Sequence, residues 1–445
     1  MRFPRYQRDF FQAASMIRAL KADPSNMELI LELHRFLIRK IVKEEKRIKR
    51  LKRIRSRLAR IKKSRRLGKD DSNKLKALMS MIEPRLKARR IMIYTWKFFG
   101  DGIANIYQPT CNLKHLYYDA NYNVKEDAGF ISGKDGFKQE WKIFRMGLDK
   151  NVPVILSDIT NIIRHGDVCA MGWSDPVPIE VKKTKHANPG GRVNRQFRQL
   201  QQLAMFYGND YAPSFRNGLD AYRIEKQSND IVYYDEINLV VRNALKDGYS
   251  SMEVESGLTY FCSRIARDEG LDVNSVKHLE SICGFKNSVV FHELTPEEDW
   301  GVAYPFTLSL EDECLVAFIQ NDISILILYD LEEIRSEYLK NGVYAKFIMD
   351  GKSAIQICLD ESDLMKGAYR IGEQYFNREV MGFNSVKDFI ESSCVMLKQL
   401  PDLKVRDGEL KERAINFDEE LLQEWKNAKD LLIDEKQETP NTKES

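Results

Sequence analysis

The sequence predicts an α/β protein made of three parts and a tail. A basic α-helical hairpin is expected over residues 1–97, an αβββα core within residues 98–235, and an α+β domain over residues 236–435. Residues 436–445 are polar and are expected to be disordered. Three observations predict this order: an apolar seam at helical spacing in the basic part, alternating helix and strand patterns in the middle, and strand-like apolar runs in the last part.

The charge is distributed unevenly along the chain. The net charge of the 445 residues is +4, but residues 1–97 hold 30 Lys and Arg against 9 Asp and Glu, a net of +21. The remainder is acidic, with a net of −17. Such a split indicates a first part that binds a polyanion or docks on an acidic partner.

The basic part predicts two helices. Residues 39–66 contain 16 basic residues in 28, and isoleucines and leucines recur between Ile41 and Ile61 at spacings of 3, 4 and 7. The LGKDDSN stretch (67–73) ends this helix, and a second helix follows, which Pro84 should kink. An antiparallel hairpin with a very basic outer surface is expected, and nucleic acid or an acidic protein surface would neutralise it.

The middle part predicts the core. Residues 98–133 suggest irregular structure with short strands, and 135–150 form an amphipathic helix. Strands are expected at 152–160, 166–172 and 177–183, and a helix over 195–208 follows a loop at 186–194. A further hairpin is expected at 222–235.

The last part predicts an α+β domain. Helices are expected at 236–247, 256–268, 331–341, 384–399 and 418–433. Strands are expected at 302–308, 314–320 and 323–329, the last two as a β-hairpin and not a membrane span, and a hairpin turns at Asp350-Gly351. The seven dispersed cysteines have no zinc spacing and fit a reducing cytoplasm, and the N-terminus lacks the apolar core of a signal peptide.

One predicted strand carries charge inside an apolar run. In residues 177–183, VPIEVKK, alternation places Ile179 and Val181 on one face and Glu180 and Lys182 on the other. Burying a carboxylate and an ammonium is costly unless they pair or do chemistry. The alternative interpretation, without a functional role, is a Glu–Lys pair on an exposed strand face.

The neighbouring strand supplies a second carboxylate. With a four-residue turn before Val177, the simplest register places Cys169 opposite Glu180 and Asp167 opposite Lys182. Asp167, Glu180 and Lys182 then share one face. Two carboxylates beside a lysine suit a hard divalent cation and phosphodiester hydrolysis.

This pattern, Gly-Asp, twelve residues, then Glu-Val-Lys, with a helix on each side, resembles the PD-(D/E)xK nuclease superfamily over residues 134–235. The resemblance implies a restriction-endonuclease-like fold in which Asp167 and Glu180 bind magnesium, for which manganese can substitute, and Lys182 assists catalysis. Glu140 would be the additional acid on the preceding helix, and Asp158 is a second choice. Gly166-Asp167 replaces the usual Pro-Asp.

Residues for substrate contact follow the motif. Arg195, Gln199 and Gln202 lie on one face of the next helix, and Lys183 and Lys185 add charge for a phosphate backbone. The sequence thus predicts a cytoplasmic magnesium-dependent nuclease acting on nucleic acid, with DNA favoured, that does not bind membranes. The alternatives are a catalytically silent nucleic-acid-binding or scaffold protein, and a toxin or host-defence component whose basic helices bind an acidic protein.

Overall fold

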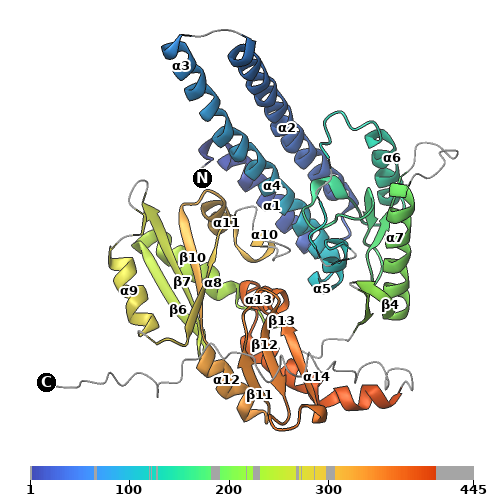
Figure 1. The fold of residues 1–445 in the computed structure, drawn as a ribbon, viewed down its shortest axis with the longest axis vertical. Helices are drawn as coiled ribbons and strands as arrows, with labels where there is room; N and C mark the ends of the chain where they lie inside the picture. The colour runs from blue at the N-terminus through green and yellow to red at the C-terminus, as the bar shows by residue number, and fades with distance from the viewer. Residues whose placement is uncertain are drawn as a thin grey trace. The chain divides into compact units, whose positions relative to one another are not determined.

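A computed structural model describes residues 3–64, 68–119, 121, 123–126, 129–181, 191–216, 218–223, 231–266, 270–271, 273–284, 286–296 and 306–406 (Figure 1). The chain forms a mixed α/β protein with two compact units. Unit 1 comprises Met1–Ile224 and Pro296–Gln320, and unit 2 comprises Glu225–Thr295 and Asn321–Ser445. The expected boundary at 97/98 falls inside a continuous helix of unit 1.

Unit 1 begins with helices, and the predicted helical hairpin is formed by two of them, α2 and α4. The helices in order are η1 (Pro4–Tyr6), α1 (Gln7–Ala22), α2 (Met27–Ser64), α3 (Lys69–Ser80) and α4 (Ile82–Tyr107). The apolar seam of α2 is buried at Ile48, which packs against Ile82 and Leu86 of α4. The helix expected here is interrupted at Met81, between α3 and α4. Pro84, which was expected to kink it, lies in the first turn of α4. Residues 98–107, expected to be irregular, continue α4 as helix.

The predicted αβββα order is confirmed. It consists of α6 (Phe137–Leu148), β1 (Val154–Leu156), β2 (Val168–Ala170), β3 (Val177–Ile179) and α7 (Gly191–Asn209). The three strands form an antiparallel sheet in the order β1-β2-β3, and β1 leads into the short helix η3 (Ser157–Ile159). The strands are shorter than expected, and α7 starts four residues earlier.

Short elements complete unit 1. They are α5 (Thr110–Leu113), η2 (Lys114–Leu116), a hairpin of β4 (Tyr211–Arg216) and β5 (Leu219–Tyr222), and the helices α10 (Phe306–Ser309) and α11 (Asp312–Ile319). The hairpin expected at 222–235 is wrong in its described part, because Tyr222 pairs with Tyr211 and residue 234 begins a helix. The strands expected at 302–308 and 314–320 are also wrong, since their described residues are largely helical.

Unit 2 is an α+β assembly with two sheets. One sheet has the order β6-β7-β10-β9, with β8 paired to β7, and the other has the order β11-β12-β13. Its helices are α8 (Tyr234–Asp247), α9 (Val273–Cys283), α12 (Leu331–Lys340), η5 (Leu364–Lys366), α13 (Glu373–Met381) and α14 (Val386–Arg406). Its strands are β6 (Tyr249–Glu255), β7 (Leu258–Ala266), β8 (Gly270–Leu271), β9 (Val289–Leu294), β10 (Ile323–Asp330), β11 (Tyr344–Phe347), β12 (Ser353–Cys358) and β13 (Ala368–Gly372).

Most predictions for unit 2 are confirmed, and one is wrong. The helix at 236–247, the strand at 323–329, the helix at 331–341 and the hairpin at Asp350-Gly351 are present. The helix expected at 256–268 is instead the central strand β7, which pairs with β6 and β10. The helix expected at 418–433 and the tail at 436–445 lie outside the described residues. None of the described helices is long and apolar enough to cross a bilayer.

Candidate functional site

Three carboxylates converge on one lysine in unit 1. Lys134 Nζ lies 2.9 Å from Glu140 Oε2, 2.9 Å from Asp158 Oδ2 and 3.3 Å from Asp167 Oδ1. We name these four residues the carboxylate cluster. Its members come from the turn before α6, from α6 itself, from η3 and from the residue before β2. The αβββα core therefore brings the predicted residues Glu140 and Asp167 together with the second-choice acid Asp158.

Local sequence explains the position of Asp167. Gly166 has a φ of +75°, and a Cβ there would lie 2.9–3.2 Å from backbone atoms of Ile179, so this position requires glycine. The Asp167 amide donates to the Ile179 carbonyl, and Asp167 Oδ2 accepts from the Val181 amide at 2.9 Å. The Gly166-Asp167 dipeptide thus lets the chain approach β3 closely and fixes the aspartate against it.

Helix α4 supports the segment that carries Asp158. A Cβ at Gly100 of α4 would lie 2.0 Å from the Ile159 carbonyl oxygen, so glycine is needed for this close approach. Asp101 accepts hydrogen bonds from the Asn161 and Ile162 amides at 2.7 and 3.1 Å. These contacts seat η3 on the helical hairpin and bury Asp158, which is 3% exposed.

Helix α2 supports the turn that carries Lys134. The buried carboxylate of Glu45 accepts from the Ile131 and Ser132 amides at 2.9 and 2.7 Å, and Lys49 donates to the Ser132 carbonyl. The hairpin is therefore part of the structure that positions the cluster, and not only a basic appendage.

The cluster is partly buried and carries excess negative charge. Lys134 is 26% exposed, whereas the side chains of Glu140 and Asp158 are 3% and 2% exposed. Burial alone would lower the pKa of Lys134, but the attraction of Asp158, Glu140 and Asp167 raises it above its usual value. Burial raises the pKa of Glu140, Lys134 opposes this shift, and Asp167 and Asp158 add to it. With all four groups ionised the formal charge is −2.

The predicted strand register is wrong by two residues. Val168 pairs with Ile179 and Cys169 pairs with Pro178, so Asp167 does not lie opposite Lys182, nor Cys169 opposite Glu180. A shift of two keeps the same faces, and the register continued by one residue places the half-buried Glu180, directly after β3, opposite Asp167, directly before β2. The expected register failed because the loop between β2 and β3 is longer than a four-residue turn.

Other predicted residues are only partly placed. Lys182, Lys183 and Lys185 lie outside the described residues, and Arg195 is described only as part of the α7 backbone. Gln199 and Gln202 are half-buried on α7. Lys134 was missed by sequence reasoning, and its only signal is its place in a glycine-containing turn directly before the helix that bears Glu140.

No family model, curated protein or solved structure matches this chain.

The cluster has properties that suit a cation. Glu140 Oε2 is buried and accepts no hydrogen bond of good geometry, although it lies near Lys134 Nζ. Within the described ranges, no three His, Cys, Asp or Glu side chains form a ready-made metal site. Lys134 stands between these carboxylates, and a divalent cation would balance the remaining charge of −2. The donors, all carboxylate oxygens, are those that magnesium and manganese prefer.

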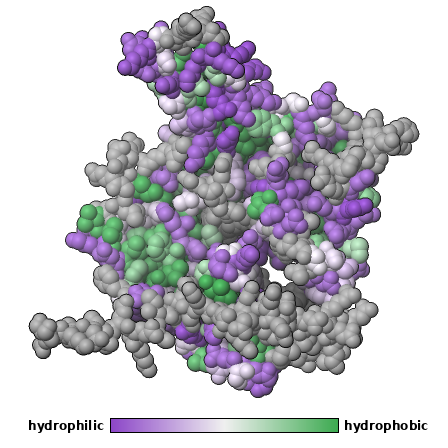
Figure 2. Space-filling model, viewed as in Figure 1, coloured by the Kyte–Doolittle hydropathy of each residue, from purple (hydrophilic) through white to green (hydrophobic). Residues whose placement is uncertain are grey.

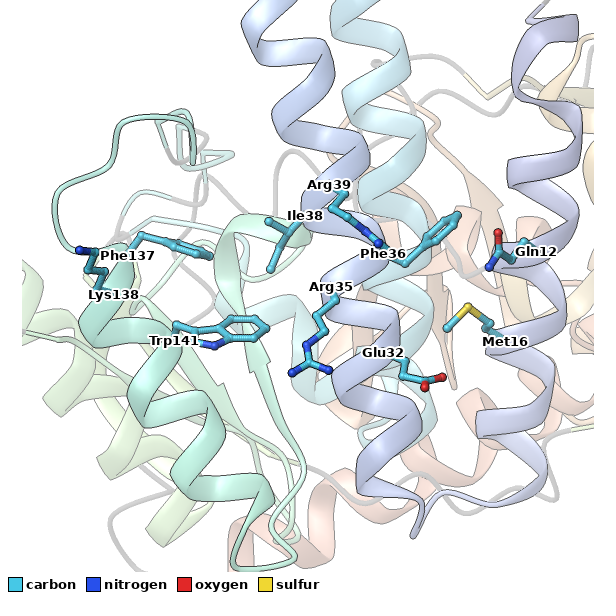
Figure 3. A pocket seen from close by; sticks show the side chains of 10 residues that line it. All are labelled: Gln12, Met16, Glu32, Arg35, Phe36, Ile38, Arg39, Phe137, Lys138 and Trp141. Carbon is cyan, nitrogen blue, oxygen red and sulfur yellow. The ribbon is translucent and has the colours of Figure 1, made fainter.

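A groove of about 690 Å³ lies on another face of α6. Its walls are α1, α2 and α6, and Figure 3 shows Phe137 and Trp141 on α6 directed toward Ile38 and Arg35 on α2. The remaining lining residues are Gln12, Met16, Glu32, Phe36, Arg39 and Lys138. Helix α6 thus contributes Glu140 to the cluster and aromatic side chains to the groove.

Proposed function

We propose that this protein is a metal-dependent nuclease of the PD-(D/E)xK superfamily with a restriction-endonuclease-like core. The observation that carries the proposal is the convergence of Glu140, Asp158 and Asp167 on one point of an αβββα unit, with Glu180 beside Asp167. The resemblance implies acids on the helix before the sheet and at the second and third strands, and Glu140, Asp167 and Glu180 lie on α6, directly before β2 and directly after β3.

The cofactor would be magnesium, or manganese in its place. Asp167 and Glu180 would bind it, and Glu140 would be a third acid. Asp158 would add a further negative charge beside the metal. When bound, the metal would supply positive charge at a phosphoryl oxygen and lower the pKa of a water molecule. Lys182 would stabilise the negative charge that develops on the phosphate. Burial of the cluster lowers the local dielectric and strengthens these electrostatic interactions.

The substrate would be nucleic acid, with DNA favoured. Figure 2 shows hydrophilic side chains over the outer parts of α2 and α3, and α2 presents exposed cations that include Arg50, Arg53 and Arg57. Such a row suits a phosphate backbone without reading its sequence. Arg195, Gln199 and Gln202 on α7, with Lys183 and Lys185, would hold the strand near the cluster.

The test is cleavage of plasmid, single-stranded DNA and RNA with magnesium, with manganese and with EDTA. Glu180→Ala and Lys182→Ala should abolish metal-dependent cutting, and Lys142→Ala, an exposed lysine on α6, should cut like the wild type. Equal cutting by all four proteins would show that the activity does not come from this site.

A second candidate is a catalytically silent nucleic-acid-binding protein. The observation that favours it is Lys134, whose ammonium already occupies the centre of the three carboxylates. In that case the wild type would shift labelled nucleic acid at low salt, without cleaving it under any metal condition.

A further inference from the structure

We propose that the groove between α1, α2 and α6 binds a nucleobase together with its 5′-phosphate. The base would stack on Trp141, and the phosphate would lie on Arg35 and Arg39. This site is separate from the carboxylate cluster, and the proposal stands whether or not the cluster binds a metal.

The aromatic wall of the groove packs on the buried Phe144. The ring centroids of Trp141 and Phe144 are 5.0 Å apart. Phe144 is fully buried, and its ring centroid lies 4.3 Å from that of His34. Phe137 stacks near Trp141, with ring centroids 6.2 Å apart and an interplanar angle of 28°. A half-exposed indole held in this way is ready to stack on a flat ring at little entropic cost, and stacking contributes about 1–3 kcal/mol per base.

The charge of the groove selects an anion. Arg35, Arg39 and Lys138 are exposed, against the single acid Glu32. Among the described contacts, none joins any of these three cations to a carboxylate. Two arginines one helical turn apart can share one phosphate, because residues i and i+4 lie on the same helix face.

The size of the groove agrees with this ligand. About 690 Å³ lies within the range of small-molecule sites and accommodates a mononucleotide. Apolar lining at Ile38 and Met16 would cover the edges of a base, and Gln12 offers a polar group.

The ligand can come from two sources, a free nucleotide or the 5′ end of a nucleic acid strand. The test is isothermal titration of the full chain with AMP, with a 5′-phosphorylated oligo-dT, with the same oligo lacking the phosphate, and with inorganic phosphate. Trp141→Ala and the Arg35→Gln/Arg39→Gln pair are compared with Lys246→Gln. Lys246 is an exposed cation in the last turn of α8 and does not line the groove.

The expected result is binding of AMP or of the phosphorylated oligo that falls at least 10-fold in Trp141→Ala and in the double arginine variant, but stays within 2-fold in Lys246→Gln. Binding of AMP alone identifies a free nucleotide, and tighter binding of the oligo identifies a strand end. The proposal is overturned if neither ligand binds. It is also overturned if Trp141→Ala binds as the wild type does, or if phosphate binds as tightly as AMP. Circular dichroism of each variant establishes that it is folded.

Discussion

Replacing Lys134 by methionine removes the ammonium group of the carboxylate cluster and keeps most of the apolar stem. Glu140 and Asp158 are almost fully buried, so they lose a partner that solvent cannot replace. Breaking a fully buried ion pair costs about 3–5 kcal/mol. Because Lys134 is 26% exposed, we discount this to about 2–3 kcal/mol in metal-free protein.

The same variant makes a second, opposite prediction for metal. Without Lys134 the three carboxylates are unbalanced, and nothing covalently attached competes for their centre. Manganese should therefore bind Lys134→Met more tightly than the wild type. Manganese at about 100 times its Kd would stabilise the folded Lys134→Met protein by about 2.7 kcal/mol, which is close to the stability lost with the ion pairs.

The assay is thermal unfolding in EDTA and in excess manganese. We expect the melting temperature of Lys134→Met to lie about 4–10 °C below that of the wild type in EDTA, and the gap to close in manganese. Lys142→Met, which removes an exposed charge from the same helix, should match the wild type in both conditions. If Lys134→Met is as stable as the wild type in EDTA, and manganese stabilises the two equally, the reasoning about the cluster is wrong.

Three further predictions concern parts that support the site. Gly166→Ala should cost about 2–3 kcal/mol, because it forces a side chain onto β3 at positive φ; urea denaturation measures this, and Gly208→Ala, which meets no atom within 4 Å, should cost nothing. Burial lowers the pKa of His34 to about 4, so its contribution is present above pH 6.5 and is lost as pH falls toward 4. The wild type should lose about 2 kcal/mol more than His34→Gln between pH 7 and pH 5 in urea titrations, and equal losses would contradict a neutral His34. Arg50→Gln/Arg57→Gln should weaken binding to any DNA sequence and reduce the slope of log K against log salt by about 2, as measured by fluorescence anisotropy, and an unchanged slope would place the DNA elsewhere.

The His34 measurement needs the variant comparison for a physical reason. Burial raises the pKa of Asp101 to about 7, although hydrogen bonds from Asn161 and Ile162 oppose this shift. The stability that Asp101 contributes is therefore lost as the pH rises from the carboxyl pKa of the unfolded chain toward 7, the folded-state pKa. This is the reverse of the His34 effect. The two contributions offset one another in the wild type, and the difference between wild type and His34→Gln isolates the histidine.

The sequence predicted the elements of the core because their signals are local. The amphipathic helix at 137–148, the three short strands and the helix after them each show the required spacing within one segment. Glu140 and Asp167 were found for the same reason. The run CLVAFIQ predicts a strand, but a short run that is apolar on every side fits a buried helix equally well. The acids at 312–313 favour a helix start, and the structure has a helix there.

Features that depend on distant contacts were not predictable. The loop between β2 and β3 is held by Gln108, which donates to the carbonyls of Met171 and Trp173, and by Asn112, which donates to Ser174. These contacts come from the end of α4 and from α5, more than 60 residues earlier in the chain, and the predicted register does not include them. Lys134 was missed likewise, because Glu45, far away in sequence, places its turn.

The central claim is that the carboxylate cluster is the centre of a metal-dependent nuclease. Its most direct test is the initial rate of magnesium-dependent plasmid cleavage by Asp167→Asn, which keeps the shape of the side chain and removes its charge. We predict cleavage by the wild type that EDTA stops, and a loss of at least about 100-fold in the folded variant. Cleavage by Asp167→Asn at the wild-type rate would contradict the claim, as would a wild type that cuts equally well in EDTA.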